Sequence, residues 1–248
     1  MNKFEVKHEL VNLLFPDGIK CIICGREMHF SRYGLCDKCK LELNENYCLR
    51  CGRHKVGIGD YCGECARRSV MFDEARSAVV YTESARSIVR RLKFGNARYL
   101  VTSMSEYMLD VLMFTDWEYD CFTFVPVDDK RKKRRGYNQA ELLAEALSFK
   151  TTTPCYPLLK KIKSTQNQAR LGREERLTNP VGAFQAVGTV PDHIVLIDDV
   201  MTTGATASEC AKTLKRAGAK VVYLLTFASV AEQVVIDKPV QNIRDFRR

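Results

Sequence analysis

The sequence predicts an α/β fold, a mainly parallel sheet flanked by helices, preceded by a small cysteine-rich module. Three observations predict it. Apolar strands alternate with amphipathic helices over most of the chain, and eight of the 11 cysteines lie between Cys21 and Cys65. The string "IVLIDDVMTTGATA" (194–207) places two carboxylates and a run of small residues directly after an apolar strand. We expect an N-terminal segment with a cysteine-rich module, an α/β domain and a C-terminal tail, at 1–70, 71–229 and 230–248.

Length and composition set the class of protein. The 248 residues suffice for one ordinary domain and a small module, and 46% of them are hydrophobic. No stretch approaches the roughly 20 apolar residues of a membrane span, and the N-terminus lacks the uninterrupted apolar region of a signal peptide. We therefore expect a cytoplasmic protein without a membrane span. The net charge of +9 favours polyanionic partners such as nucleotides, nucleic acid or acidic lipid, without choosing among them.

The clustered cysteines form four CxxC pairs. Two such pairs supply the four thiolates that Zn²⁺ prefers in a closed, tetrahedral structural site. A disulfide framework is disfavoured, because nothing indicates secretion and cytosolic thiols stay reduced. The sequence thus predicts two structural zinc ions without a catalytic role. The eight predicted ligands are Cys21, Cys24, Cys36, Cys39, Cys48, Cys51, Cys62 and Cys65.

The cysteine pattern also repeats. Cys21 and Cys48 are 27 residues apart, and Cys36 and Cys62 are 26 apart. A duplicated unit favours sequential pairing, in which the first four cysteines bind one zinc ion and the last four the other, over an interleaved arrangement. Basic and aromatic residues around the cysteines suit contact with nucleic acid, and a docking or folding module with a solvated surface fits equally well.

The first half of the α/β segment contains a strand, two helices and a second strand. "SAVVYT" (77–82) is a short apolar run typical of a strand. "SARSIVRRLKF" (84–94) and "RYLVTSMSEYMLDVLMF" (98–114) carry apolar residues at helical spacing, and the methionines of the second helix fit a packed core. "CFTFVPV" (121–127) is the second strand.

The second half continues the alternation. "NQAELLAEALSF" (138–149) is a helix and "HIVLIDD" (193–199) is a strand. "ATASECAKTLKRAGA" (205–219) is a helix with Gly218 where a C-cap is expected, and "KVVYLLTFA" (220–228) is the last strand. Strands that alternate with helices in this way predict a mainly parallel sheet covered on both faces. Ligands of such sheets bind beyond the carboxyl ends of the strands.

The acidic pair and the loop after it suit a sugar phosphate. Within a strand, Asp198 and Asp199 would face opposite sides and one would be forced into apolar packing, so we expect both at the strand's end, bent toward one ligand. The start of the next helix offers backbone N–H groups and a favourable dipole for a phosphate. The loop is neither a Walker A motif, which needs GxxxxGK[ST], nor the dinucleotide motif GxGxxG.

These residues resemble a known family. "VLIDDVMTTGAT" is similar to the 5-phosphoribosyl-1-pyrophosphate (PRPP) motif of type I phosphoribosyltransferases. Together with the cysteine module, "RRGYNQAELLA" and "QARLGREERLTNPVGAF" resemble the ComF competence proteins, over roughly 21–228. The resemblance implies a type I phosphoribosyltransferase-like fold, PRPP and Mg²⁺ as ligands, and a role in uptake of single-stranded DNA during natural transformation. It also implies a partner ATPase or helicase of the uptake machinery.

The resemblance also assigns site residues. Asp198 and Asp199 would be catalytic and hold the ribose hydroxyls, and Lys93 and Arg135 would be further ligand contacts. The loop residues that would hold the 5-phosphate are Thr202, Thr203, Gly204, Ala205 and Thr206. The sequence departs from the family pattern at Asp128 and Asp129, at Pro180 and in the tail after about residue 230.

Six consecutive cations, Lys130 to Arg135, form a predicted basic loop after the strand 121–127. At this end of the sheet, two of the six cations could bind a pyrophosphate. The remaining positive charge suits the phosphates of a nucleic-acid strand. A solvated loop is the plain alternative. The polar segment 163–184 suits a catalytic hood. The predicted nucleic-acid-binding residues are Lys132, Lys133, Arg134, Arg135, Tyr137, Arg170 and Arg173.

Two functions follow from these motifs. In the first, the chain is a competence protein that binds single-stranded DNA and carries a PRPP and Mg²⁺ site. In the second, it is an active phosphoribosyltransferase, unrelated to DNA, that transfers ribose 5-phosphate from PRPP to an unidentified acceptor. A zinc-dependent hydrolase is excluded, because eight cysteine ligands leave no open position on the metal.

Overall fold

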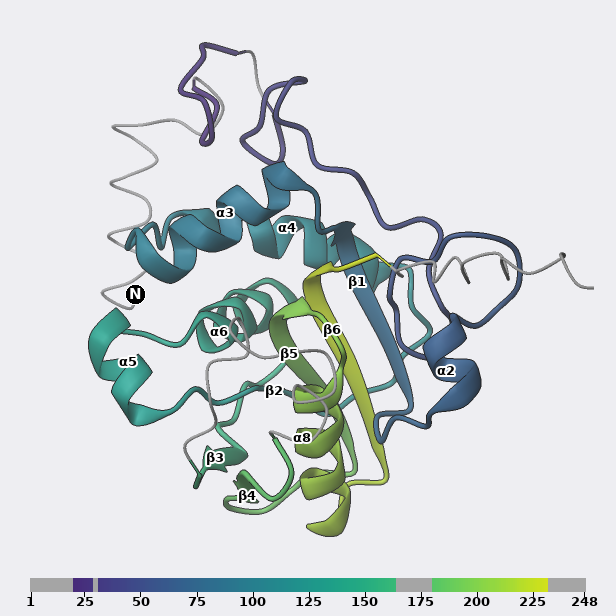
Figure 1. Ribbon diagram of the computed structural model, residues 1–248. Coiled ribbons are helices and arrows are strands. Elements are labelled where there is room, and N and C mark those ends of the chain that lie inside the picture. The colour runs from purple at the N-terminus through teal and green to yellow at the C-terminus, as the bar shows by residue number, and fades with distance from the viewer. Residues whose placement is uncertain (1–19, 29–30, 164–179, 232–248) are drawn as a thin grey trace, which may run out of the picture.

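The computed structural model describes residues 20–28, 31–163 and 180–231 (Figure 1). Its main sheet has four strands in the order β1-β6-β5-β2, and every neighbouring pair is parallel. The strands are rich in buried aliphatic and aromatic residues on both faces, as a covered parallel sheet requires. Their bounds are Glu74–Val80 (β1), Cys121–Phe124 (β2), His193–Met201 (β5) and Val221–Ser229 (β6).

Helices cover both faces of this sheet. Three of them, α3, α4 and α6, form one core with the sheet, and α8 lies on the opposite face beside β5 and β6. Their bounds are Glu83–Phe94 (α3), Leu100–Met113 (α4), Gln139–Thr151 (α6) and Ala205–Arg216 (α8). The predicted mainly parallel sheet flanked by helices is confirmed.

The prediction of a basic loop after β2 is wrong in one respect. Its cations form a short helix, α5 (Asp129–Arg135). Asp128 begins this helix: its side chain accepts a hydrogen bond from the backbone N–H of Arg131 at 2.9 Å. Gly136 ends it in the left-handed conformation, with φ of 79°. The unexpected acidic residues after the strand are therefore a helix cap and a first-turn residue, placed favourably for the helix dipole.

Two short strands and a short helix were not predicted. The strands β3 (Leu159–Lys161) and β4 (Phe184–Ala186) pair antiparallel on either side of the expected hood, of which 164–179 lies outside the described residues. At three residues each, they are too short to show an alternating pattern. Helix α2 (Gly63–Arg67) is a single short helix that begins directly after Cys62 and contains Cys65, the last cysteine of the module.

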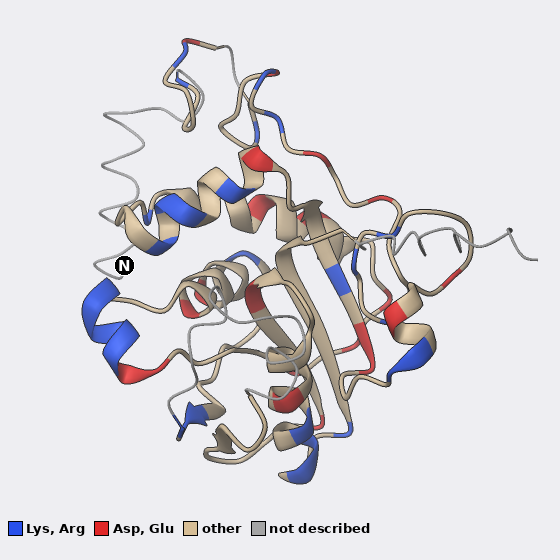
Figure 2. Cartoon of the chain, viewed as in Figure 1, with Lys and Arg blue, Asp and Glu red and all other residues tan. Residues whose placement is uncertain are grey.

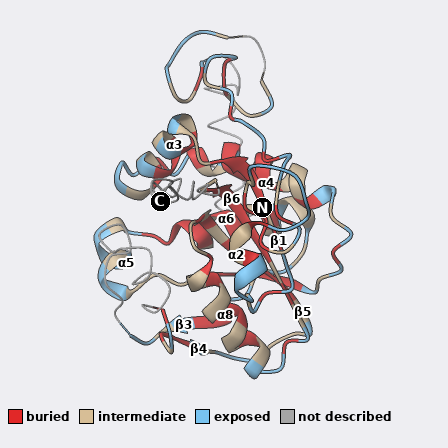
Figure 3. Cartoon of the chain, turned by 45° about the vertical axis from the view of Figure 1, so that its right-hand side comes forward, coloured by how far each residue is buried: buried red, intermediate tan, exposed pale blue. Residues whose placement is uncertain are grey.

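The cysteine module packs directly onto the α/β domain. The segment that joins its two units runs antiparallel to β1: Asn44 N–H donates to the Ala78 carbonyl at 3.1 Å, and Val80 N–H donates to the Glu42 carbonyl at 2.9 Å. The first unit packs against the α3–α4 side and the second joins the core that contains α8. Figure 3 shows the strands buried between these layers and α5 largely exposed.

Candidate functional site

The acidic pair lies inside a strand, whereas we expected it at the strand's end. Strand β5 continues to Met201, and Asp198 pairs in register with Thr226 of β6. Successive side chains of a strand alternate between faces, so the two carboxylates lie on opposite sides of the sheet. The two residues still touch, because Oδ1 of Asp198 accepts a hydrogen bond from the Asp199 N–H at 2.8 Å and the two carboxyls interact directly. That both carboxylates bend toward one ligand stays a prediction.

Asp198 faces the loop 202–206, which we call the phosphate loop. Together with Thr226, it lines a hollow of about 30 Å³ whose other wall is the phosphate loop itself. Gly204, with φ of 74°, is the N-cap of α8, and no acidic residue occupies the first turn of that helix. The structure thus brings Asp198 together with Thr202, Thr203, Gly204, Ala205 and Thr206, as predicted.

The phosphate loop presents groups that suit an anion. Among the residues that the structure describes, the backbone N–H groups of Thr203 and Gly204 donate to no protein acceptor. The Ala205 N–H makes only a long contact, 3.4 Å, to the Thr203 hydroxyl. Free amides at the start of a 12-residue helix, beside threonine hydroxyls, form the kind of site that holds a phosphate.

Asp199 faces the other side of the sheet, where α3 lies. It is buried, and its Oδ2 lies 2.7 Å from Nζ of Lys93 in α3. Arg135 lies on the same side, where its positive charge interacts with Asp199, and its Nη1 donates to Oε1 of Gln139 at 2.9 Å. The structure therefore joins both predicted cationic contacts, Lys93 and Arg135, to Asp199 rather than to the phosphate loop.

Gln139 is a site residue that the sequence analysis missed. It is buried, and its Nε2 donor and the Nε donor of Arg135 both lack a hydrogen-bond partner. Buried donors without acceptors are unfavourable unless a ligand or water supplies one. The pair therefore suits the oxygens of a phosphate or pyrophosphate. The only signal in the sequence is the position of Gln139, four residues after the last of the six cations.

Burial, and next the neighbouring charge of Asp199, raise the pKa of Asp198 to about 7, against the opposing effect of Lys93. The folded chain therefore keeps a proton on Asp198 at pH values where the unfolded chain has lost it.

We predict that Asp198 makes the free energy of unfolding fall as pH rises from about 4 to about 7, by roughly 2 to 4 kcal/mol. The stabilisation is fully present at pH values below the pKa of Asp198 in the unfolded chain. It is lost as the pH rises through the pKa of Asp198 in the folded chain. Denaturant unfolding of wild type and Asp198→Asn, at pH 5 and pH 8, measures it. The variant should gain stability relative to wild type at the higher pH. A difference that is the same at both pH values would contradict the prediction.

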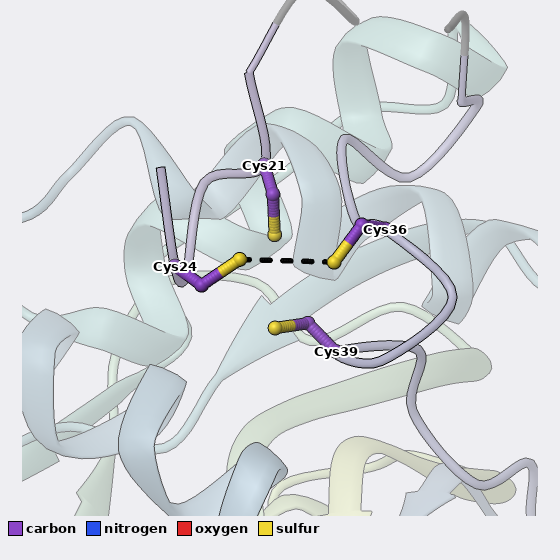
Figure 4. A group of neighbouring side chains, drawn as sticks. All are labelled: Cys21, Cys24, Cys36 and Cys39. Carbon is purple, nitrogen blue, oxygen red and sulfur yellow. Dashed lines mark hydrogen bonds between the residues drawn. The ribbon is translucent and has the colours of Figure 1, made fainter. Parts of the chain in front are cut away.

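The eight cysteines form two groups of four, each with all sulfur atoms within 4.8 Å of one another. The pairing is sequential, so the interleaved alternative is excluded. A tetrahedron with Zn–S bonds of about 2.3 Å places sulfur atoms about 3.8 Å apart. The Sγ atoms of Cys24 and Cys36 in the first group are 3.7 Å apart (Figure 4), and those of Cys51 and Cys62 in the second group are 3.6 Å apart. Both groups fit zinc, and the two structural zinc sites are confirmed.

Comparison with known proteins decides the family. A profile of the family described as "Double zinc ribbon domain" matches residues 10–66. Competence protein F of Haemophilus influenzae is 28% identical over 210 residues, covering 80% of this chain and 92% of that protein. Competence protein ComFC of Streptococcus pneumoniae is 30% identical over 221 residues, covering 82% of this chain and 96% of that protein. The chain belongs to the ComF competence-protein family.

Solved structures similar to this ComF-family chain include phosphoribosyltransferases. Adenine phosphoribosyltransferase from Trypanosoma brucei aligns with a TM-score of 0.36 at 11% identity, over 62% of this chain and 75% of that one. The sheet of the ComF-family chain is mainly parallel and flanked by helices, with the phosphate loop between β5 and α8, as its sequence predicts. No helix among the described residues is long and apolar enough to cross a membrane.

The predicted DNA-binding residues of the ComF-family chain divide into four groups, one of which is Arg135 alone, whose side chain donates to Gln139 as described above. Lys132, Lys133 and Arg134 are exposed on α5, where Lys and Arg cover most of the helix (Figure 2). Tyr137 does not present its ring to solvent, because it is 5% exposed and its hydroxyl donates to the Leu92 carbonyl. It packs in the core beneath the Arg98 guanidinium instead of offering a surface for base stacking. The remaining two, Arg170 and Arg173, lie outside the described residues.

Proposed function

We propose that this chain is a cytoplasmic protein of DNA uptake that binds single-stranded DNA and carries a site for PRPP and Mg²⁺. The observation that carries the proposal is the hollow between Asp198 and the phosphate loop. The unpartnered amides of Thr203 and Gly204, beside the threonine hydroxyls, suit the 5-phosphate, and Asp198 suits the ribose hydroxyls or a Mg²⁺ ion bound to them. The names of the relatives, Competence protein F and DNA utilization protein YhgH, support the role in DNA uptake.

The exposed cations of α5 support the proposed contact with DNA. Lys133 and Arg134 have no protein partner among the described residues, whereas Lys132 pairs with Glu141 at 2.9 Å. Free cations next to one another are a suitable contact for the phosphates of a flexible strand. A partner ATPase or helicase that moves the strand would complete the proposed role.

Reversing Lys133 and Arg134 to glutamate should weaken the binding of single-stranded DNA by about tenfold or more at low salt. The dependence of affinity on salt should become shallower, because each phosphate contact contributes a slope of about 0.7 for single strands. Fluorescence anisotropy with a labelled oligonucleotide measures both. The control reverses two exposed cations near the amino end of β6, Arg216 and Lys220, of which Lys220 pairs with Asp192 at 2.6 Å. Equal losses in the two double variants would contradict the proposed DNA surface.

An active phosphoribosyltransferase is the second candidate, favoured by the unpartnered donors of Arg135 and Gln139 beside the Lys93–Asp199 pair. These groups suit the pyrophosphate that leaves PRPP when an acceptor attacks the ribose. Release of pyrophosphate in the presence of PRPP, Mg²⁺ and candidate acceptors tests it. Turnover that requires no DNA, in a chain that binds none, would favour this candidate over the first.

A further inference from the structure

We propose that Arg53 is a positioning residue that ties the second zinc unit to the phosphate loop, so that the second zinc site, and not the first, supports phosphoribosyl binding. The inference rests on the proposed PRPP site and adds to it the part of the zinc ribbon that holds the site in place. It starts from a comparison of the two repeated units.

The two units have the same local structure around an arginine. "CGRE" (24–27) in the first corresponds to "CGRH" (51–54) in the second. In each unit the N–H of the first cysteine donates at 2.8 Å to the carbonyl of this arginine, Arg26 or Arg53. The preceding glycine is left-handed in both, with φ of 70° in the first and 65° in the second. Local sequence therefore does not distinguish the two arginines.

Their surroundings do distinguish them. A Cβ atom at Gly25 would meet nothing within 4 Å, whereas one at Gly52 would lie 2.5 Å from the carbonyl oxygen of Ala75 in β1. The second unit thus presses its backbone against the sheet, which only glycine permits at this distance. As a result Arg26 is exposed, while the side chain of Arg53 is only 7% exposed.

The buried side chain of Arg53 contacts the phosphate loop. Its Nη1 lies 2.7 Å from Oε2 of Glu64, which stands between the last two zinc ligands. Its Nη2 donates to the carbonyl of Thr202, the first residue of the phosphate loop. One planar guanidinium therefore joins the zinc unit to the loop, a geometry that a lysine side chain cannot reproduce.

The second unit is itself fixed to the sheet. Asn44 Nδ2 donates to the Gly52 carbonyl at 2.8 Å, and His54 N–H donates to the Ser229 hydroxyl at 3.1 Å. Behind the phosphate loop lies a cleft of about 250 Å³, lined by Arg53 and by the start of α8. Because the loop borders open space there, its backbone depends on the few contacts that cross the cleft, and Arg53 makes one of them.

The test compares Arg53→Met with Arg26→Met, two substitutions at equivalent positions of the repeat, in the full zinc-loaded chain. Loop exchange is measured without ligand as the hydrogen exchange of two bonded amides at the ends of the phosphate loop, and PRPP affinity is measured with Mg²⁺. The two amides are Ser208 N–H, which donates to the Gly204 carbonyl at 2.8 Å, and Val230 N–H, which donates to the Met201 carbonyl at 3.0 Å. In Arg53→Met these amides should exchange about tenfold faster and PRPP should bind about tenfold more weakly, because a charged hydrogen bond contributes roughly this factor or more. In Arg26→Met both quantities should stay within about twofold of wild type, since that side chain is exposed.

Two further measurements separate positioning from general destabilisation. Zinc content should stay at two ions per chain, and exchange in the interior of β5 should not change. Arg53→Lys, which keeps the charge next to Glu64, should recover part of the affinity and serves in place of the methionine variant if that variant does not fold. Equal loop exchange in the Arg53 and Arg26 variants would overturn the inference. Failure of the wild-type chain to bind PRPP would instead remove the proposed function, and loop exchange would still decide the role of Arg53.

Discussion

Replacing Cys51 with serine is expected to abolish stable folding, whereas Cys24→Ser is expected to leave a folded α/β domain with one zinc ion. All four cysteines of the second site are at most 6% exposed, and they belong to the same core as α8 and β6. A structural zinc site contributes about 10–16 kcal/mol in small zinc domains, which equals or exceeds the stability of a typical protein. Loss of the second site should therefore remove the core itself.

The first site has a different relation to the core. Cys24 is exposed, and the first unit is attached to α3 and α4 through side chains such as Arg91, which donates to the Ile22 carbonyl at 2.9 Å. Tyr33 also stacks on Tyr107 of α4, with ring centroids 3.9 Å apart. Cys21 and Cys36 are buried with α3 and α4, but Cys24 is exposed and Cys39 is half-buried, so the first site is less enclosed than the second and its loss should cost less of the core. Zinc content and circular dichroism on heating measure the outcome, and equal effects of the two substitutions would contradict it.

Asp198→Asn is expected to weaken Mg²⁺-dependent PRPP binding by about a hundredfold while it stabilises the protein above pH 7. The carboxylate lies where burial opposes its charge, which makes it unfavourable for folding but available to a cation or to hydroxyl donors. The substitution removes a charged hydrogen bond and a metal contact, and each loss is expected to weaken PRPP binding by roughly tenfold. Calorimetric titration with PRPP, with and without Mg²⁺, measures the affinity.

The matched variant is Asp199→Asn. It removes the partner of Lys93 without touching the hollow at the phosphate loop, so its effect on affinity should be smaller than that of Asp198→Asn. If Asp199→Asn weakens binding as much as Asp198→Asn does, the separate surroundings of the two carboxylates do not correspond to separate roles. If neither variant changes affinity, PRPP binds elsewhere.

Elements with a strong pattern could be predicted from the sequence. The four strands of the main sheet and helices α3, α4, α6 and α8 lie within a few residues of the predicted ranges. Their apolar residues repeat at the period of the element over many positions, which local sequence alone can show. Helix α5 could not be recognised in the same way, because its seven residues carry no apolar face and only its caps, Asp128 and Gly136, mark it.

The candidate site was predictable in composition but not in orientation. The positions of the phosphate loop and the acidic pair along the chain could be read from the sequence. The side of the sheet that each carboxylate faces could not, because it depends on where β5 ends. Pairing of Val200 and Met201 with β6 extends β5 past the acids, and this depends on contacts with a strand more than 20 residues away. Burial of Tyr137 and the inward turn of Arg53 likewise arise from tertiary packing, which no local pattern records.

The central claim is that the hollow between Asp198 and the phosphate loop holds a phosphoribosyl group. Its most direct test is thermal or denaturant unfolding of the full zinc-loaded chain titrated with PRPP and Mg²⁺. At a ligand concentration of 100 times the dissociation constant, the free energy of unfolding should rise by about 2.7 kcal/mol in wild type and much less in Asp198→Asn at the same concentration. No stabilisation of wild type at about 1 mM PRPP, or equal stabilisation of both proteins, would contradict the claim.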